Sequence, residues 1–332
     1  MEQLGAFFMT ARTIADLERR ILLAEELGYT IAGLPQIAGR DPMMTLASIA
    51  PKTTSIALAT GIVPIWTRTP VALAQEAAVL NELTDGRFKL GIGVGHRELI
   101  ESWHGTPFKN PLTAMRDYLT IVKGALEGMV EHKGSMFHSS FAFMGYQPQP
   151  LPVLIAALGP KMLQLAGEKS DGVVLWLSSV HHIKETVMPN ITAGAAKAGK
   201  SVKDLEVFAC LFAAPGPNRK SARDAIRRQI FAYVQLPFYR TAMIEAGFQE
   251  DLTKFDEAMK DGDLPLALEG LSDQLIDSIA ATGNEEEVAQ TLNAFCEAGC
   301  TVPGVGVVGG YEGYEGMEAS LRAVRRAGAL VA

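Results

Sequence analysis

A glycine, a proline and a lysine follow one another at Gly159-Pro160-Lys161, between an apolar run and an amphipathic run. Proline is favoured in the first turn of a helix, where the backbone N–H groups have no partner within the helix and can bind an anion. The lysine adds a positive charge at the same point. The pattern predicts a phosphate site, with helix initiation alone as the alternative. Gly309-Gly310 is a rival phosphate loop, but it has no cation beside it and is followed by acidic residues.

A histidine, His96, comes directly after the glycine-rich run at residues 91–95. Its side chain ionises near neutral pH, so it can donate or accept a proton in a reaction. A hydrogen bond from His96 to a bound molecule or to a carbonyl group is an equally good interpretation. The glycines before it lack a Cβ, which would let a ligand lie close to the backbone, although packing explains such glycines as well.

Other catalytic patterns are missing from the sequence. There is no pair of carboxylates placed for acid–base hydrolysis, no G-x-S-x-G motif, and no group of His, Asp and Glu at metal-binding spacing. Cys296 and Cys300 stand close together without other ligands, so we interpret them as packing residues. This shortage of catalytic side chains is typical of an enzyme whose cofactor carries the reaction, and we predict no metal site.

The elements that must position these residues alternate regularly along the chain. Apolar runs of strand length precede amphipathic runs of helical period, and Asp41 with Pro42 is a helix start signal. Eight such units predict a protein of the α/β class with a (β/α)8 TIM barrel, and a doubly wound open sheet is the competing architecture. The expected strands are residues 4–9, 30–34, 55–63, 88–94, 153–157, 173–177, 205–211 and 301–308, and the expected helices are residues 13–27, 43–50, 70–83, 111–127, 161–168, 181–198, 285–298 and 316–327.

Two segments interrupt this rhythm. Residues 128–152 hold glycines, prolines and aromatic residues and predict a small hairpin, and residues 215–271 predict an inserted helical subdomain. We therefore expect one barrel domain over residues 1–332 with these two insertions. The active site of a barrel lies where its strands end, and both His96 and the Gly159 turn follow expected strands.

The composition sets limits on the class of protein and on its partners. Apolar residues make up 48% of the 332 residues and charged residues 20%, which provides a large core and excludes intrinsic disorder. The net charge of −7 argues against nucleic acid or an anionic membrane as the main partner. Three cysteines cannot form a disulfide framework, and no apolar run is long enough to span a membrane. We expect a cytoplasmic protein that acts on a small molecule.

Several segments together resemble one known family, the bacterial luciferase-like flavin and deazaflavin oxidoreductases. Residues 101–108, which precede the helix from Pro111, and residues 151–161, which include the expected strand at residues 153–157, are similar to the actinobacterial branch that uses the deazaflavin coenzyme F420. The segments that carry the resemblance are GIVPIWTRTP from Gly61, LTDGRF from Leu83, ESWHGTPF from Glu101, LPVLIAALGPK from Leu151 and GNEEEV from Gly283.

The resemblance implies an F420-dependent oxidoreductase, in which hydride passes between the coenzyme and an electrophilic carbon of a small organic substrate. An FMN-dependent monooxygenase that uses oxygen is the first alternative, and a flavin-binding relative without turnover is the second. The family also implies a homodimer. A longer anionic tail on the coenzyme would need basic residues around the barrel mouth, and those available are Lys161, Arg68, Arg97 and Lys109.

The resemblance further implies which residues bind the cofactor. Gly61-Ile62 matches a position where such proteins carry a non-prolyl cis peptide or a bulge behind the ring, and we predict one of these geometries here. Val94-Gly95 matches the other flank of the ring, and the Gly159 turn matches the phosphate site. The cofactor-binding residues expected on this basis are Gly61, Ile62, Val63, Val94, Gly95, Leu158, Gly159, Lys161 and Met162.

The sequence also departs from deazaflavin-dependent dehydrogenases of this family. Their acid–base residues after strands one and two are replaced by Met9-Thr10 and Leu34-Pro35-Gln36, and a glutamate after strand four is replaced by His96, our catalytic candidate. Trp103 and His104 match a family signature, with loop packing as the alternative. Further aromatic residues could wall a pocket (Trp66, Trp176, Phe212) or form a lid from the first insertion (Phe137, Phe141, Phe143, Tyr146).

Overall fold

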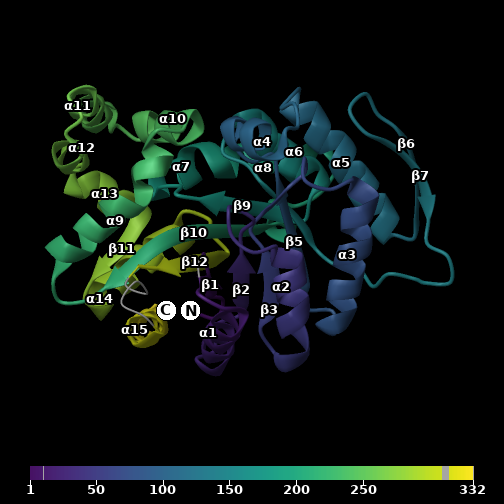
Figure 1. Ribbon diagram of the computed structural model, residues 1–332, viewed down its shortest axis with the longest axis horizontal. Coiled ribbons are helices and arrows are strands. Elements are labelled where there is room, and N and C mark those ends of the chain that lie inside the picture. Colours follow the sequence, from purple (N-terminus) through teal and green to yellow (C-terminus); the bar gives the residue numbers. More distant parts are fainter. Residues whose placement is uncertain (10, 309–313, 332) are drawn as a thin grey trace.

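The computed structural model describes the chain except for residues 10, 309–313 and 332. Its centre is a closed barrel in which each parallel strand pairs with the next, and the last strand pairs with the first (Figure 1). The predicted (β/α)8 barrel is therefore confirmed, and the alternative of an open sheet is wrong. The barrel strands are β1 (Gly5–Phe7), β2 (Ile31–Leu34), β3 (Ala57–Thr60), β5 (Phe88–Gly93), β8 (Val153–Ala156), β9 (Gly172–Trp176), β10 (Glu206–Pro215) and β12 (Val302–Val307).

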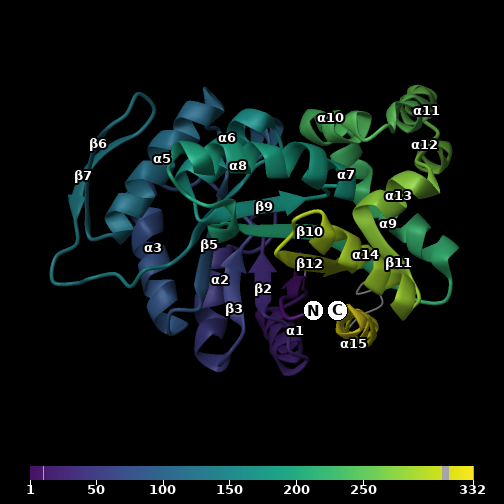
Figure 2. The ribbon, with the colours of Figure 1, turned by 180° about the vertical axis from the view of Figure 1, so that it is seen from behind.

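Helices cover the outside of the barrel, as both views of the ribbon show (Figures 1 and 2). Side-chain caps start several of them. The Asp41 carboxylate accepts from the Met44 N–H at 2.9 Å, as the sequence suggests, and Asn284 forms a capping box with Glu287. The covering helices are α1 (Ile14–Glu26), α2 (Pro42–Ile49), α3 (Pro70–Leu83), α5 (Pro111–Leu126), α6 (Pro160–Lys169), α7 (Val180–His182), a π-helical turn (Ile183–Val187), α8 (Met188–Lys197), α14 (Glu285–Glu297) and α15 (Tyr314–Leu330).

Side chains from nearly every strand fill the barrel interior. Phe7 and Phe208 are the largest of them, and both are almost fully buried. Phe208 occupies space that two glycines leave open, since an added Cβ would lie 2.7 Å from its ring at Gly5 and 2.5 Å at Gly304. The interior is thus a packed layer, which closes the barrel below the strand ends.

The third strand differs from the single strand expected over residues 55–63. It is divided into β3 and a short β4 (Val63–Pro64), which pairs with β5. The peptide bond between Gly61 and Ile62, at the division, is cis, so this part of the prediction is confirmed. Two further elements lie where the sequence analysis places none: α4 (Arg97–His104), and β11 (Ala280–Gly283), which pairs with the end of β10.

The first interruption of the rhythm holds an antiparallel hairpin of β6 (Met129–Lys133) and β7 (His138–Ala142). The buried carboxylate of Asp117 on α5 anchors it by accepting the backbone N–H of Met136 at 2.8 Å and a hydrogen bond from His132 at 3.1 Å. The hairpin projects from the side of the barrel beyond α3 (Figures 1 and 2). Its turn residue Phe137 packs against Trp66 with 6.2 Å between ring centroids, but neither β6 nor β7 lines the cavity at the strand ends.

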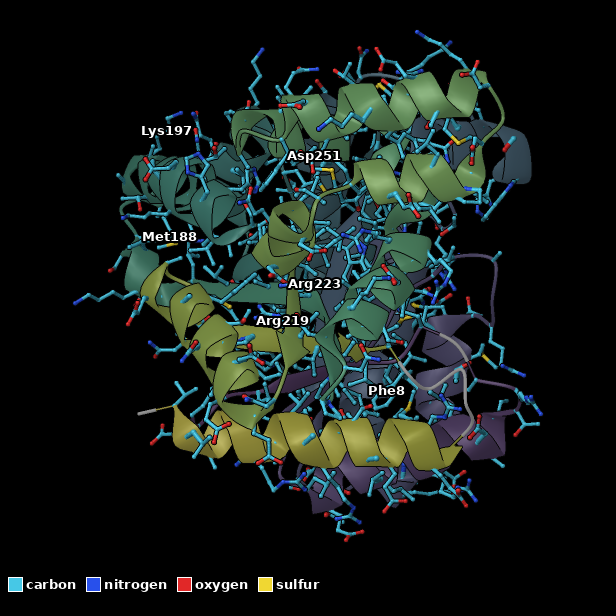
Figure 3. The ribbon with its side chains drawn as sticks, turned by 90° about the vertical axis from the view of Figure 1, so that its left-hand side faces the viewer. Phe8, Met188, Lys197, Arg219, Arg223 and Asp251 are labelled. Atoms are coloured by element: carbon cyan, nitrogen blue, oxygen red, sulfur yellow. The ribbon has the colours of Figure 1, made fainter. Side chains whose placement is uncertain are left out.

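The second interruption holds four helices, α9 (Arg219–Val234), α10 (Pro237–Glu245), α11 (Gln249–Lys260) and α12 (Leu264–Gly270), and α13 (Asp273–Ile279) follows them. They share a second apolar cluster with Leu177 and Phe212 of the barrel. Figure 3 labels two arginines of α9, Arg219 and Arg223. They bind the neighbouring elements, since Arg219 donates to Glu287 at 2.7 Å and Arg223 to Asp273 at 2.8 Å. These contacts fix the helices over the barrel.

Candidate functional site

One cavity of about 910 Å³ opens at the carboxyl ends of the barrel strands. Its wall combines the ends of β1, β2, β3, β5, β8 and β9 with side chains of α4, α9 and α10, and it is largely apolar. The volume is at the upper end of the range for small-molecule sites and suits a tricyclic ring together with a substrate. Within the described residues, no three His, Cys, Asp or Glu side chains come together as a metal site.

The cavity brings together almost all of the residues expected to bind the cofactor. Val63 is the exception: it is fully buried in the core between barrel and helices, whereas its neighbours Ile62 and Pro64 line the cavity. Successive side chains of a strand point to opposite faces, so Val63 faces away from the cavity. The expected residues that line the cavity are Gly61, Ile62, Val94, Gly95, His96, Leu158, Gly159, Lys161 and Met162.

Gly61 has a reason for being glycine that the sequence did not reveal. An added Cβ would lie 2.2 Å from Cζ of Phe7, whose ring also lines the cavity. The ring has little room to retreat, because a Cβ at Gly33 would lie 2.5 Å from Cε2 of the same ring. The Phe7 ring therefore packs over the backbones of both glycines, and Gly61 and Ile62 line the cavity beside it.

The glycines of β5 serve packing, and the idea that they admit a ligand is wrong. Neither Gly91 nor Gly93 lines the cavity. A Cβ at Gly91 would lie 2.1 Å from the carbonyl oxygen of Thr60, and one at Gly93 would lie 2.8 Å from Cδ1 of Ile62. Because these two glycines have no side chain, the backbone of Thr60 and the side chain of Ile62 can pack closely against β5. This packing places Ile62 at the cavity wall.

The predicted phosphate turn lies at the N-terminus of α6. Gly159 is the N-cap residue without a side-chain cap, Pro160 follows in the first turn, and the Lys161 side chain is exposed at the cavity rim. The first N–H groups of a helix have no acceptor within it. An added Cβ at Gly159 would meet nothing within 4 Å, so the turn faces open space. The arrangement can hold an anion. The rival loop, Gly309-Gly310, lies outside the described residues.

His96 is the candidate proton donor, and the structure places it on the cavity wall. It is the N-cap residue of α4, and its ring packs against the ring of Tyr239 with 5.7 Å between centroids. Burial lowers the pKa of His96 below its usual value, and the nearby Glu98 carboxylate only partly opposes this effect. The imidazole is therefore mostly neutral at pH 7, and it gains its proton only at a lower pH than an ordinary histidine does.

The basic residues expected to bind the coenzyme tail differ in their availability. Arg68 is paired with Asp41 and with Glu76, and Arg97 donates to Glu101 at 3.1 Å. Neither arginine lines the cavity, and neither does Lys109. Of these four cations, Lys161 alone lies on the cavity wall within the described residues.

Several aromatic side chains of the cavity wall come from helices in which the sequence shows no motif. Trp176 and Trp103 line the cavity as expected, as does His104. Trp66 instead donates to the carbonyl of Val94 at 2.9 Å, and Phe212 packs behind Trp176. The hairpin aromatics line no part of the cavity, so the expected lid is wrong. Side chains that sequence reasoning missed are Tyr233, Phe238 and Tyr239 of α9 and α10, and Leu99 and Ile100 of α4.

Comparison with known proteins shows the family of the chain. Residues 2–301 match the luciferase-like monooxygenase family, and the chain belongs to that family, as the sequence predicts. It is 30% identical over 306 residues to a 5,10-methylenetetrahydromethanopterin reductase of Archaeoglobus fulgidus, with 90% of this chain and 91% of the relative covered. It is 25% identical to a putative coenzyme F420-dependent oxidoreductase of Mycobacterium tuberculosis, over 85% of this chain and 88% of that protein.

Among solved structures, a coenzyme F420-dependent tetrahydromethanopterin reductase of Methanopyrus kandleri superposes with a TM-score of 0.85. The two sequences are 24% identical, and 97% of each chain is covered. This likeness extends over the whole barrel and shows that the chain has the same fold.

Proposed function

We propose that this chain is an F420-dependent oxidoreductase that transfers a hydride between the deazaflavin coenzyme and a small organic substrate. Relatives that are named for F420 or act as reductases match the chain over most of its length. The observation that carries the proposal is the Gly159–Lys161 turn, because it combines an uncapped helix N-terminus, a cation and open space at the rim of an apolar cavity.

The described residues fit a deazaflavin and its phosphate. The Gly61–Ile62 backbone and Val94-Gly95 would hold the two flanks of the ring, and the N-terminus of α6 with Lys161 would hold the phosphate. When bound, the coenzyme supplies a carbon, C5, that gives or takes a hydride. The apolar walls would keep water from the reacting atoms, and His96 would move a proton on the substrate side.

The FMN-dependent monooxygenase remains the second candidate, because the family takes its name from such enzymes. Titration of the purified apoprotein with F420 and, separately, with FMN distinguishes the two candidates, with binding followed by the fluorescence of each ligand. We expect F420 to bind at least ten-fold more tightly than FMN, which corresponds to about 1.4 kcal/mol. Tighter binding of FMN, with oxygen consumed when reduced FMN is supplied, would favour the monooxygenase. Binding of either without turnover would favour the non-catalytic relative.

His96→Ala should reduce turnover about a hundred-fold while changing F420 affinity little, because a proton donor acts mainly in the transition state. Since burial lowers the pKa of His96, the protonated fraction rises as the pH falls below 7. Substrate reduction by the unaltered enzyme should therefore speed up toward mildly acidic pH, and this limb of the rate profile should vanish in His96→Ala. His138→Ala, at an exposed histidine of the hairpin that does not line the cavity, is the control and should leave turnover unchanged. Equal losses of affinity and turnover would identify His96 as a positioning residue instead.

We further propose that the protein works as a homodimer in the cytoplasm. The dimer is supported by the family resemblance, and the compartment by three cysteines that are all free in the structure. No helix among the described residues is long and apolar enough to cross a membrane. We also propose that residues 1–332 form one domain, with insertions at about 128–152 and 215–271.

A further inference from the structure

A buried histidine outside the cavity holds the turn that precedes α6. His182 is 3% exposed, and its Nε2 lies 3.1 Å from the carbonyl oxygen of Leu158. Leu158 lines the cavity directly before Gly159, the N-cap residue of α6, whereas His182 does not line the cavity. The histidine therefore contacts the back of the turn, on the side away from any ligand.

The protonation of this ring follows from its two partners. A carbonyl oxygen can only accept, so the hydrogen on the ring must be on Nε2, which donates to Leu158. The other nitrogen, Nδ1, lies 3.2 Å from the hydroxyl of Ser178 and accepts its hydrogen. Burial is the largest influence on the pKa of His182 and lowers it, although the Leu158 carbonyl and Glu245 on α10 act in the opposite direction and His181 adds to the lowering. The ring is neutral at pH 7, with both nitrogens satisfied.

The loop between β9 and α7, which leads to His182, has an unusual conformation at Leu177. Leu177, the residue after β9, has a φ of +53°, a region that leucine rarely adopts, and its N–H donates to the carbonyl of Cys210 at 3.2 Å. The turn it makes leads into Ser178 and Ser179, and the hydroxyl of Ser179 accepts the backbone N–H of His182 at 3.1 Å. Such local outliers persist where the surrounding structure fixes them, and they cluster at functional sites.

We infer that His182 is a positioning residue for coenzyme binding: by holding the Leu158 carbonyl, it sets the Gly159–Lys161 turn in the geometry that receives the phosphate. The inference rests on the proposed function, because it takes the phosphate to lie at this turn. Gly159 has no side chain and Pro160 has no N–H, so the other contacts of the turn are the Gly159 carbonyl, which accepts from the Leu163 N–H at 3.0 Å, and the packing of Leu158 against the second apolar cluster. Neither of these holds the Leu158 carbonyl. Loss of the Nε2 donor leaves the Leu158 carbonyl without this partner and frees the turn to shift.

The test compares two ligands that differ in the phosphate tail. His182→Met keeps the length of the side chain but removes the donor, and we measure its affinity for F420 and for the phosphate-free deazaflavin chromophore. We expect F420 affinity to fall about five-fold, because one buried hydrogen bond is lost, while affinity for the chromophore stays within about two-fold. His182→Gln should recover most of the F420 affinity, because its amide N–H extends to the position of Nε2.

Controls separate positioning from a purely structural role. His181→Gln changes the adjacent, exposed histidine and should leave both affinities unchanged. Equal losses for both ligands in His182→Met, or no loss for either with the fold intact by circular dichroism, would overturn the inference. If the unaltered protein binds FMN and not F420, the proposed function fails, and the same comparison with FMN and riboflavin then tests the role of His182 independently.

Discussion

Lys161→Glu is expected to weaken F420 binding by about ten-fold or more while the thermal midpoint of unfolding stays close to that of the unaltered protein. The Lys161 side chain is exposed at the cavity rim and has no ion pair among the described residues, so the fold loses little when it is replaced. The bound phosphate would lose a charge-assisted contact and gain a repulsive carboxylate beside it. Fluorescence titration of the purified apoprotein measures the change.

A matched control makes the same change of charge elsewhere. Lys260 is the exposed last residue of α11 and does not line the cavity, so Lys260→Glu should leave the F420 affinity within about two-fold of the original. Repeating the titrations in high salt should reduce the difference between the unaltered protein and Lys161→Glu, because salt screens the interaction at the rim. An unchanged affinity in Lys161→Glu would exclude this turn as the phosphate site and direct attention to Gly309-Gly310.

Much of the barrel could be predicted because its signals are local. The alternation of apolar and amphipathic runs depends on the chain's own periodicity, and helix starts such as Asp41-Pro42 depend on neighbours within one turn. The signal for the predicted phosphate turn is local too, because three consecutive residues, a glycine, a proline and a lysine, define it. In the structure these residues lie at the N-terminus of α6 on the cavity wall.

What could not be predicted depends on contacts between distant parts of the chain. Gly91 is a glycine because the carbonyl of Thr60 lies against it, and no local pattern distinguishes this packing from the approach of a ligand. Tyr239 reaches the cavity because the second insertion folds back over the strand ends, where its ring meets His96. His182 of α7 donates to the Leu158 carbonyl before α6, and as one of two adjacent histidines in a helical run it gave no signal.

Val63 shows that a segment which reaches the cavity can contain a residue that faces away from it. The sequence identifies the end of the third strand correctly, and both neighbours of Val63 line the cavity. Which side chain of β4 faces the cavity depends on the register of β4 in the sheet. Its pairing with β5, Val63 opposite Ile92, sets that register. A resemblance to a family identifies the segment that reaches the cavity. The strand pairing in the fold then determines which residues of that segment face the cavity.

Gly61→Val is expected to lower both the stability of the protein and its affinity for F420. A Cβ at this position would lie 2.2 Å from Cζ of Phe7, and the ring is enclosed by Gly33 on one side and by Phe208 and Trp176 on others. Overpacking of this kind costs about 1–3 kcal/mol in the free energy of unfolding. Displacement of the ring or of the Gly61 backbone would also deform the cavity floor, so F420 affinity should fall more than ten-fold.

Two comparisons attribute this loss to the contact between residue 61 and the ring of Phe7. Gly39 has no atom within 4 Å of an added Cβ, so Gly39→Val should leave both the free energy of unfolding and the affinity nearly unchanged. In a Phe7→Leu background the shorter side chain relieves the clash, and Gly61→Ala should cost less stability there than it does in the unaltered protein. Chemical denaturation gives the free energies, and fluorescence titration gives the affinities. If Gly61→Val behaves like Gly39→Val in both measurements, then Gly61 does not set the cavity floor, and its role in holding the ring must be abandoned.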